Sequence, residues 1–249
     1  MHRFYLPASE CRTPLLMLKG REAHHAMHVL RIARGESVTI LNGNGGEYLC
    51  DVLDCHGDVV TLKVRHQSTA PPLPYELTLF QAVPKGKLME TIIQKATELG
   101  AARIVPVLSD RVVPNLGDTE TAEHKLQKWQ LVAIEAIKQS GQPWLPHVEP
   151  PSPLKNVLSG QNKPELCLLA SLQPGARHPR HYFDEFRSLH GRSPKTIGLW
   201  IGPEGDFTPA EMAEIKAAGA FPISLGRLVL RVETAAIYAM SVCNYELQA

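Results

Sequence analysis

Residues 197 to 211 read Ile-Gly-Leu-Trp-Ile-Gly-Pro-Glu-Gly-Asp-Phe-Thr-Pro-Ala-Glu, an apolar run followed by a glycine-flanked turn and the start of a helix. Thr208 is placed to cap that helix, Pro209 suits its first turn, and Glu211 completes a capping box three residues after the cap. The turn is therefore expected at the carboxyl end of a strand, where open α/β sheets bind their ligands. A strand-to-helix turn without a ligand fits the bare pattern equally well.

A second glycine-bearing turn follows at residues 224 to 236, Ser-Leu-Gly-Arg-Leu-Val-Leu-Arg-Val-Glu-Thr-Ala-Ala. Its strand is expected to end at Leu225, and the next helix is expected to begin near Leu230. Two such loops would wall an apolar cleft with free backbone amides and carbonyls, which suits an adenine ring better than a phosphate. The chain lacks the glycine-rich fingerprints of phosphate-binding loops, which agrees with this interpretation.

Apolar runs alternate with helical patterns from residue 77 to residue 246. Strands that are apolar on both faces and separated by helices indicate a parallel sheet covered on both sides, so the expected fold class is α/β. The strands are expected at residues 77 to 82, 104 to 108, 166 to 170, 196 to 201 and 222 to 225. The helices are expected at residues 87 to 99, 120 to 139, 209 to 218 and 232 to 246.

Residues 70 to 74, Ala-Pro-Pro-Leu-Pro, mark a break, because their prolines remove backbone donors and disfavour both a helix and a central strand. We place a domain boundary there, between a small domain of residues 1 to 72 and a larger domain of residues 73 to 249. The small domain is expected to be β-rich. Its strands are expected at residues 36 to 41, 47 to 53 and 58 to 64, and its helix at residues 21 to 32.

The composition of the 249 residues, 44% of them hydrophobic, predicts an ordinary globular core. No apolar run is long enough to cross a bilayer and the amino terminus lacks a signal-peptide pattern, which favours a cytoplasmic protein. The five cysteines contain no C-x-x-C pair and are interpreted as reduced thiols. The net charge of +1 gives no signal for nucleic acid, so RNA affinity would have to come from local basic clusters.

Three histidines, His24, His25 and His28, lie close together in the small domain. His24 and His28 are one helical turn apart, but neither a third ligand nor an H-E-x-x-H pattern accompanies them. No metal is therefore expected, and core packing or a contact to RNA is favoured for these side chains.

The two glycine turns together resemble the cofactor-binding signature of the SPOUT-superfamily methyltransferases that modify N3 of a uridine in 16S ribosomal RNA. The matching segments are Gly202-Pro203-Glu204-Gly205 and Leu225-Gly226-x-x-x-Leu230-Arg231-x-Glu233-Thr234-Ala235. Residues 85 to 100 and 128 to 142 are similar to two long helices of the family, and residues 3 to 5 and 25 to 31 to its small amino-terminal domain. Two positions depart from the family pattern: Asp206 often corresponds to a glycine, and Lys138 usually to an acid.

The resemblance implies a carboxyl-terminal SPOUT α/β domain with a deep trefoil knot and an amino-terminal PUA-like β-barrel that binds RNA. It implies S-adenosylmethionine as the cofactor, and as the function methylation of a specific uridine at N3 in the 16S ribosomal RNA of the small ribosomal subunit. It also implies a homodimer in which both chains shape the active site, with no membrane or metal partner. The cofactor-binding residues that it implies are Leu169, Gly202, Pro203, Glu204, Gly205, Leu225, Gly226, Leu228, Leu230, Thr234 and Ala235.

Methylation at N3 of uracil needs activation, because the protonated nitrogen is a poor nucleophile. A base within hydrogen-bond reach would supply it, as would a cation that stabilises negative charge on the flanking carbonyl oxygens. We hypothesise that Arg231 is this catalytic cation, although an arginine here could also be solvated or paired with Glu233. The base is not identified, since an acid such as Glu204 in a turn is more often bonded to local amides.

Phosphate contacts in RNA complexes come mostly from arginine and lysine. Each of the five residues expected to bind RNA could instead be a solvated surface charge: Arg3, Arg31, Arg34, Lys85 and Lys87. Two alternative functions stay open. One is a SPOUT enzyme acting on another RNA position, such as a ribose hydroxyl, and the other is a noncatalytic ribosome-binding factor, against which the intact loops and Arg231 argue.

Overall fold

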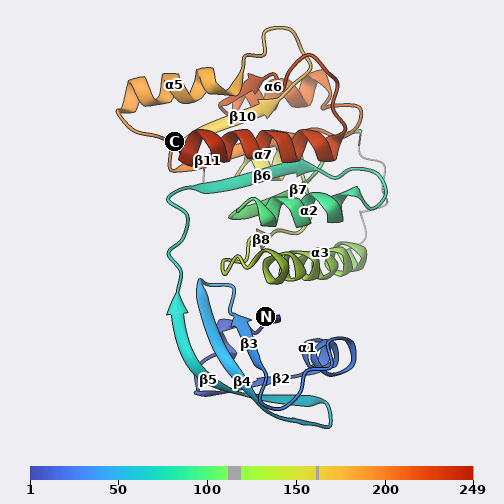
Figure 1. Ribbon diagram of the computed structural model, residues 1–249. Helices are drawn as coiled ribbons and strands as arrows, with labels where there is room; N and C mark the ends of the chain where they lie inside the picture. Colours follow the sequence, from blue (N-terminus) through green and yellow to red (C-terminus); the bar gives the residue numbers. More distant parts are fainter. Residues whose placement is uncertain (112–118, 161–162, 249) are drawn as a thin grey trace. The chain divides into compact units, whose positions relative to one another are not determined.

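The computed structural model describes residues 1 to 111, 119 to 160 and 163 to 248, and the chain divides into two compact units. Unit 1 comprises Met1–Pro72 and Ile134–Leu145, and unit 2 comprises Leu73–Ala133 and Pro146–Ala249. The helix α3 (Thr119–Ser140) therefore contributes residues to both units (Figure 1).

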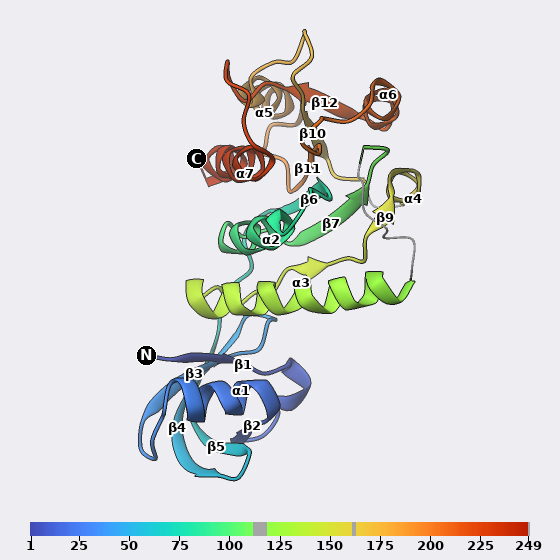
Figure 2. The same ribbon diagram turned by 90° about the vertical axis from the view of Figure 1, so that its right-hand side faces the viewer.

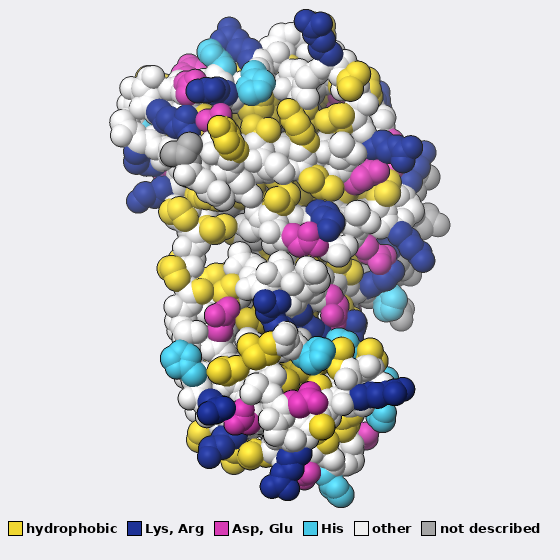
Figure 3. Space-filling model, in the orientation of Figure 1, with side chains coloured by type: hydrophobic (Ala, Val, Ile, Leu, Met, Phe, Trp, Pro, Cys, Tyr) yellow, Lys and Arg dark blue, Asp and Glu magenta, His cyan; other side chains and the backbone are white. Residues whose placement is uncertain are grey.

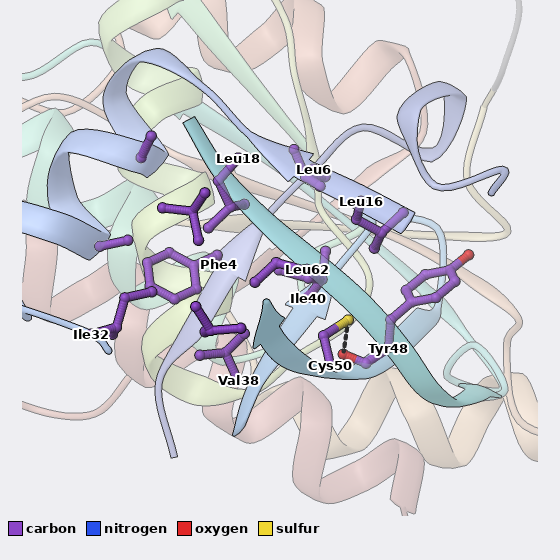
Figure 4. Close-up of a cluster of buried hydrophobic side chains, with 14 of the residues drawn as sticks. Phe4, Leu6, Leu16, Leu18, Ile32, Val38, Ile40, Tyr48, Cys50 and Leu62 are labelled. Carbon is purple, nitrogen blue, oxygen red and sulfur yellow. Dashed lines mark hydrogen bonds between the residues drawn. The ribbon is translucent and has the colours of Figure 1, made fainter. Parts of the chain in front are cut away.

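Unit 1 is built on a five-stranded sheet in the order β1-β3-β4-β5-β2. β1 pairs in parallel with β3, and the other pairs are antiparallel. Buried and less buried residues alternate along most of β4, as expected for a strand with one face on a core. That core includes Phe4, Ile40 and Leu62 (Figure 4). The strands are β1 (Arg3–Tyr5), β2 (Leu15–Leu18), β3 (Ser37–Leu41), β4 (Gly46–His56) and β5 (Val59–Thr69).

The helical segment of unit 1 differs from the single helix expected over residues 21 to 32. A short helix, α1 (Gly20–His24), continues into a π-helical turn at His25–Val29, where the Leu30 N–H donates to the His25 carbonyl. Arg31 then adopts a left-handed backbone with a φ of 54°, which ends the helix. One extra residue in a single turn barely changes the apolar spacing of so short a segment, so the sequence could not reveal it.

Unit 2 contains a parallel sheet in the order β12-β10-β11-β6-β7-β8, with β9 (Ser152–Pro153) also paired to β7. Figure 2 shows α2 and α7 on one side of this sheet and α4 and α6 on the other. This arrangement confirms the expected α/β class. The strands are β6 (Glu76–Ala82), β7 (Arg103–Leu108), β8 (His147–Val148), β10 (Leu166–Ala170), β11 (Thr196–Ile201) and β12 (Ala220–Ile223).

The helices of unit 2 include two that the sequence did not predict, the short α4 (Leu154–Leu158) and α5 (Pro179–His190). The signals of α5 were present, since Pro179 occupies its first turn and Gly191 ends it in a left-handed conformation. No described helix is long and apolar enough to cross a membrane. The others are α2 (Leu88–Glu98), α6 (Pro209–Ala217) and α7 (Val232–Gln248).

The structure corrects the expected bounds of the last strand. β12 (Ala220–Ile223) begins and ends two residues before the expected range of 222 to 225, whereas α7 begins at Val232, as expected for the helix of residues 232 to 246 and two residues after the expected end of the loop near Leu230. Pro222 lies inside the strand, which is tolerated because β12 is an edge strand and a missing N–H can face away from the sheet.

Candidate active site

Both glycine turns lie at the end of the unit 2 sheet where the carboxyl ends of its strands meet. The four neighbouring strands here, β12, β10, β11 and β6, run in parallel, so the loops that follow them leave the sheet at the same end. The turn of residues 202 to 208 follows β11 and the loop of residues 224 to 231 follows β12, with the loop after β10 between them. The sequence only suggested that the two glycine turns act together. Strand pairing places both at the same end of the sheet.

The turn after β11 is anchored at both ends. Phe207 is buried and packs edge-on against Trp200 of β11, at a centroid distance of 6.4 Å. At the start of α6, the Glu211 N–H donates to Thr208 Oγ1 at 3.2 Å, and the Thr208 N–H donates to Glu211 Oε2 at 2.8 Å. The expected capping box is therefore confirmed, and it fixes the point where the turn becomes helix.

Asp206, which the resemblance suggested stands in place of a glycine, has a left-handed backbone with a φ of 61°. Its Oδ1 accepts a hydrogen bond from the Phe207 N–H at 2.8 Å. Burial raises the pKa of the Asp206 carboxyl above its ordinary value, while the backbone N–H groups of Phe207 and Leu172 act in the opposite direction. A Cβ added at Gly202 would lie 2.8 Å from the same oxygen, so this carboxylate occupies the space beside Gly202.

Glu204, which could have been bonded to local amides, instead binds the amide of another loop. Its Oε1 accepts a hydrogen bond at 2.9 Å from the backbone N–H of Lys85, in the segment that connects β6 to α2. The guanidinium of Arg111 also donates to the carbonyl of Gly205. The turn is thus bound by segments that precede it in sequence by roughly a hundred residues.

The loop after β12 carries apolar side chains that are exposed to solvent. Leu228 is 77% exposed and Val229 is 79% exposed, and Leu172 in the adjacent loop after β10 is 64% exposed. Gly226 has a φ of 114° and open space where a Cβ would be. Exposed apolar side chains beside accessible backbone suit a flat, mostly apolar ligand with polar edges.

The structure brings all the proposed cofactor-binding residues to this end of the sheet. Leu169 is buried near the end of β10, where it pairs with Trp200 and Pro222. Thr234 and Ala235 lie in the first turn of α7. The remaining positions are in the two loops: Gly202, Pro203, Glu204, Gly205, Leu225, Gly226, Leu228 and Leu230.

Arg231 is the last residue before α7, and its side chain is exposed. The alternative pairing with Glu233 does not occur, and within the described ranges the guanidinium forms no ion pair with any acid. An exposed arginine at the end of this loop, without an acid from the described residues, is available to an oxygen of another molecule.

The residues proposed to bind RNA have different surroundings in the two units. Arg31 and Arg34 are exposed in unit 1, and Lys85 and Lys87 are exposed in the loop after β6 of unit 2. Arg3 is already engaged, since its guanidinium donates at 3.3 Å to the carbonyls of residues 138 and 139 at the end of α3. A cation at a helix carboxyl terminus stabilises that helix, so Arg3 has a structural role that the sequence did not indicate.

Lys138, the second departure from the family pattern, is buried and ion-paired. Its Nζ lies 2.9 Å from Glu22 Oε1 and 3.1 Å from Glu135 Oε1, and the lysine side chain is 5% exposed. Glu22 also accepts a hydrogen bond from the Tyr5 N–H through its other oxygen. Lys138 is thus part of the internal structure of unit 1.

The cysteines are free thiols, and Cys11, Cys50 and Cys243 are buried. Burial is the main cause that raises the pKa of Cys11 to about 11 and that of Cys243 to about 12. Among the residues described, no group of three His, Cys, Asp or Glu side chains could hold a metal ion.

Comparison with known proteins agrees with this arrangement. Residues 71 to 244 match the profile of the RNA methyltransferase domain, and residues 18 to 64 match that of the RNA methyltransferase PUA domain. The fold and the paired loops thus define an RNA methyltransferase with a PUA domain.

Two relatives show to which family of RNA methyltransferases the chain belongs. A ribosomal RNA small subunit methyltransferase E from Synechocystis is 32% identical over 93% of this chain and 73% of its own length. A protein of the same name from Bacillus subtilis is 29% identical over 99% of this chain and 97% of its own length. The chain belongs to the family of ribosomal RNA small subunit methyltransferases E.

Two solved structures share the fold of the whole chain. A methyltransferase from Legionella pneumophila in complex with S-adenosylmethionine has a TM-score of 0.87 and 31% identity, covering 98% of this chain and 96% of its own. A ribosomal RNA small subunit methyltransferase E from Neisseria gonorrhoeae bound to S-adenosylmethionine has a TM-score of 0.85 and 27% identity, covering 98% and 97% of the two chains.

Proposed function

We propose that this protein uses S-adenosylmethionine to methylate N3 of a specific uridine in the 16S ribosomal RNA of the small ribosomal subunit. The observation that carries the proposal is the meeting of two glycine turns and Arg231, which forms no ion pair with any described residue, at the carboxyl ends of the strands of one parallel sheet. Relatives named as small-subunit ribosomal RNA methyltransferases, and similar structures with bound S-adenosylmethionine, support it. The proposed location is the cytoplasm.

The chemistry of the two loops fits S-adenosylmethionine. Leu172, Leu228 and Val229 offer exposed apolar surface for an adenosine, and the backbone around Gly226 is open to close approach. The cofactor supplies a methyl group on a positively charged sulfur. The residues proposed to hold it are Leu169, Gly202, Pro203, Glu204, Gly205, Leu225, Gly226, Leu228, Leu230, Thr234 and Ala235.

Arg231 is the proposed catalytic residue. Loss of the N3 proton leaves negative charge on the two uracil carbonyl oxygens, and a guanidinium aimed at one of them stabilises that charge. Its side chain is exposed and pairs with no acid in the part of the chain that the structure describes, so its guanidinium donors are available for this task. We assign no residue as the base, because Glu204 is bound to the Lys85 amide and has a structural partner.

RNA phosphates are proposed to contact Arg3, Arg31, Arg34, Lys85 and Lys87, since phosphate contacts come mainly from arginine and lysine. Arg3 also binds two carbonyls of α3. Its replacement is therefore expected to weaken unit 1 as well as RNA binding.

The carboxyl-terminal domain is proposed to contain the trefoil knot of the SPOUT family, and the protein is proposed to act as a homodimer. Tyr238 and Tyr245 of α7 are exposed beside a groove of about 300 Å³ that His178 and Arg180 also line. Figure 3 shows hydrophobic side chains gathered on the face of unit 2 along which α7 runs. A second chain would cover this surface and complete the active site.

The experiment that tests the function is mass-spectrometric nucleoside analysis of ribosomal RNA. Cells lacking the protein are compared with cells complemented by the wild type, by Arg231→Ala or by Arg231→Lys. We expect 3-methyluridine to disappear without the protein and to return only with the wild type, because lysine is a point charge without the planar fork of arginine. With purified protein, Arg231→Lys should bind the cofactor nearly normally and lose at least about a hundredfold in turnover.

Each other outcome has a defined meaning. Restoration of 3-methyluridine by both Arg231 variants would remove this residue from the mechanism. Unchanged 3-methyluridine with loss of a different methylated nucleoside would indicate an enzyme for another RNA position. No change in any methylated nucleoside would indicate a noncatalytic ribosome-binding factor.

A further inference from the structure

Three acidic side chains in and beside the turn of residues 202 to 208 accept hydrogen bonds from backbone N–H groups. Glu204 accepts from the Lys85 N–H after β6 at 2.9 Å, and Glu211 accepts from the Asp110 N–H after β7 at 2.8 Å. Within the turn, Asp206 Oδ1 accepts from the Phe207 N–H at 2.8 Å. The turn is therefore held by its own carboxylates, both internally and against the loops after β6 and β7.

Asp206 is the residue of this turn with a left-handed backbone. Such a backbone is easiest for glycine and tolerable for aspartate or asparagine, so aspartate satisfies the turn at this position. Unlike glycine, it adds a carboxylate that accepts from the Phe207 N–H and occupies the space beside Gly202. Asp206 therefore fixes the turn next to Gly202, one of the proposed cofactor-binding residues.

We propose that Glu204 and Asp206 are positioning residues for cofactor binding, which act as hydrogen-bond acceptors: Glu204 holds the loop after β6 against the turn, and Asp206 holds the turn itself in shape beside Gly202. This inference rests on the proposed function, in which S-adenosylmethionine binds at this turn. The contribution comes from preorganisation: loops that are already in place need not be ordered when the ligand arrives. Glu211 belongs to the same set, but it also caps α6, so the test uses the other two acids.

A different role for the same acids would be electrostatic attraction of a positively charged cofactor. Amide side chains separate the two roles, because asparagine and glutamine keep an acceptor oxygen of similar reach and lose the charge. An acceptor role therefore survives Glu204→Gln and Asp206→Asn, whereas a charge role does not. Alanine removes both.

The experiment measures the dissociation constant of S-adenosylmethionine by isothermal titration calorimetry with the full chain. Glu204→Ala and Asp206→Ala should each weaken binding about tenfold, since each leaves a loop amide without its partner. Glu204→Gln and Asp206→Asn should stay within about threefold of the wild type. Glu214→Ala, which removes an exposed acid of α6, is the matched control and should leave binding unchanged.

A second pair of variants covers the case in which alanine at residue 206 prevents folding. Gly202→Ala should weaken binding by displacing the Asp206 carboxylate, and Asp206→Gly should weaken it by removing that carboxylate. Because both act on one contact, the double variant should lose less than the product of the two single effects.

Two results would overturn the inference: amide variants as weak as the alanine variants, or alanine variants as tight as the wild type. The inference would also be contradicted if the double variant lost as much affinity for S-adenosylmethionine as the product of the two single losses. A wild-type protein that does not bind S-adenosylmethionine would instead refute the proposed function, so the two failures are distinguishable.

Discussion

Asp206 combines a left-handed backbone with a partly buried carboxyl group, and its ionisation is therefore linked to folding. Burial raises its pKa above the ordinary value of 3.8, so the unfolded chain loses this proton at lower pH than the folded chain. Between the two values the folded state binds more protons. Stability from this residue is therefore present below the ordinary pKa and decreases as pH rises through the folded pKa.

Replacement of Asp206 by asparagine removes this titration and keeps an acceptor for the Phe207 N–H. We expect Asp206→Asn to be at least as stable as the wild type at pH 7, and the difference to disappear below about pH 4. Urea unfolding of both proteins between about pH 3 and about pH 8 measures it. A difference that grows as the pH falls would show the opposite sign and contradict the inferred raised pKa.

At the scale of elements, α3 depends on a buried charge near its carboxyl end. Lys138 pairs with Glu22 of α1 and with Glu135 one turn earlier on α3, and Arg3 of β1 binds the carbonyls at the end of the helix. These contacts all lie within unit 1, and they explain why the end of α3 belongs to that unit. A lysine at residue 138 is accommodated because α1 supplies Glu22.

Replacement of Lys138 by methionine should lower the free energy of unfolding by about 3 kcal/mol, because Glu22 would remain partly buried without its cation. Lys128→Met is the matched control on the same helix. Lys128 pairs with Glu90 but is 48% exposed, so its loss should be worth less than about 1 kcal/mol. Chemical denaturation of both variants measures the two losses in the free energy of unfolding. Equal losses would mean that burial of the Lys138 ion pair does not increase its contribution to stability.

At the scale of the whole molecule, α7 carries an aromatic surface that is exposed to solvent in a single chain. Tyr245 is 74% exposed and Tyr238 is 46% exposed, and both line the groove beside α5. Aromatic residues are enriched in protein interfaces and are seldom left in water as a group. This surface supports the proposed homodimer.

Sedimentation velocity at micromolar concentration should therefore give a dimer for the wild type and a monomer for Tyr238→Ser/Tyr245→Ser. Leu189→Ser is the control, because Leu189 is 75% exposed on α5 and does not line the groove. Methyl transfer should decrease with the loss of the dimer if both chains shape the active site. A wild-type monomer with full activity would contradict the shared site.

Local patterns in the sequence were sufficient for the main elements of unit 2 and for the turns. β10 and β11 have the expected bounds, and the capping box of Thr208 and Glu211 is present, because strand apolarity and helix capping depend on residues close in the chain. The π turn was missed because one extra residue barely changes the apolar spacing of a short segment, and α4 and α5 were missed although Pro179 and Gly191 mark the ends of α5. The two glycine turns and Arg231 were also identified from the sequence, by their resemblance to a family.

The sequence by itself determined the class of fold and the local elements, because strand apolarity and helix capping depend on residues close in the chain, and it suggested the candidate site through the resemblance of two loops to a family. Only the tertiary structure decided which distant groups bind one another. The carboxylate of Glu204 and the backbone amide of Lys85 are 119 positions apart, and the ammonium group of Lys138 and the carboxylate of Glu22, both in unit 1, are 116 apart. Such partners are selected by strand order and helix packing, which bring together residues that no local pattern connects.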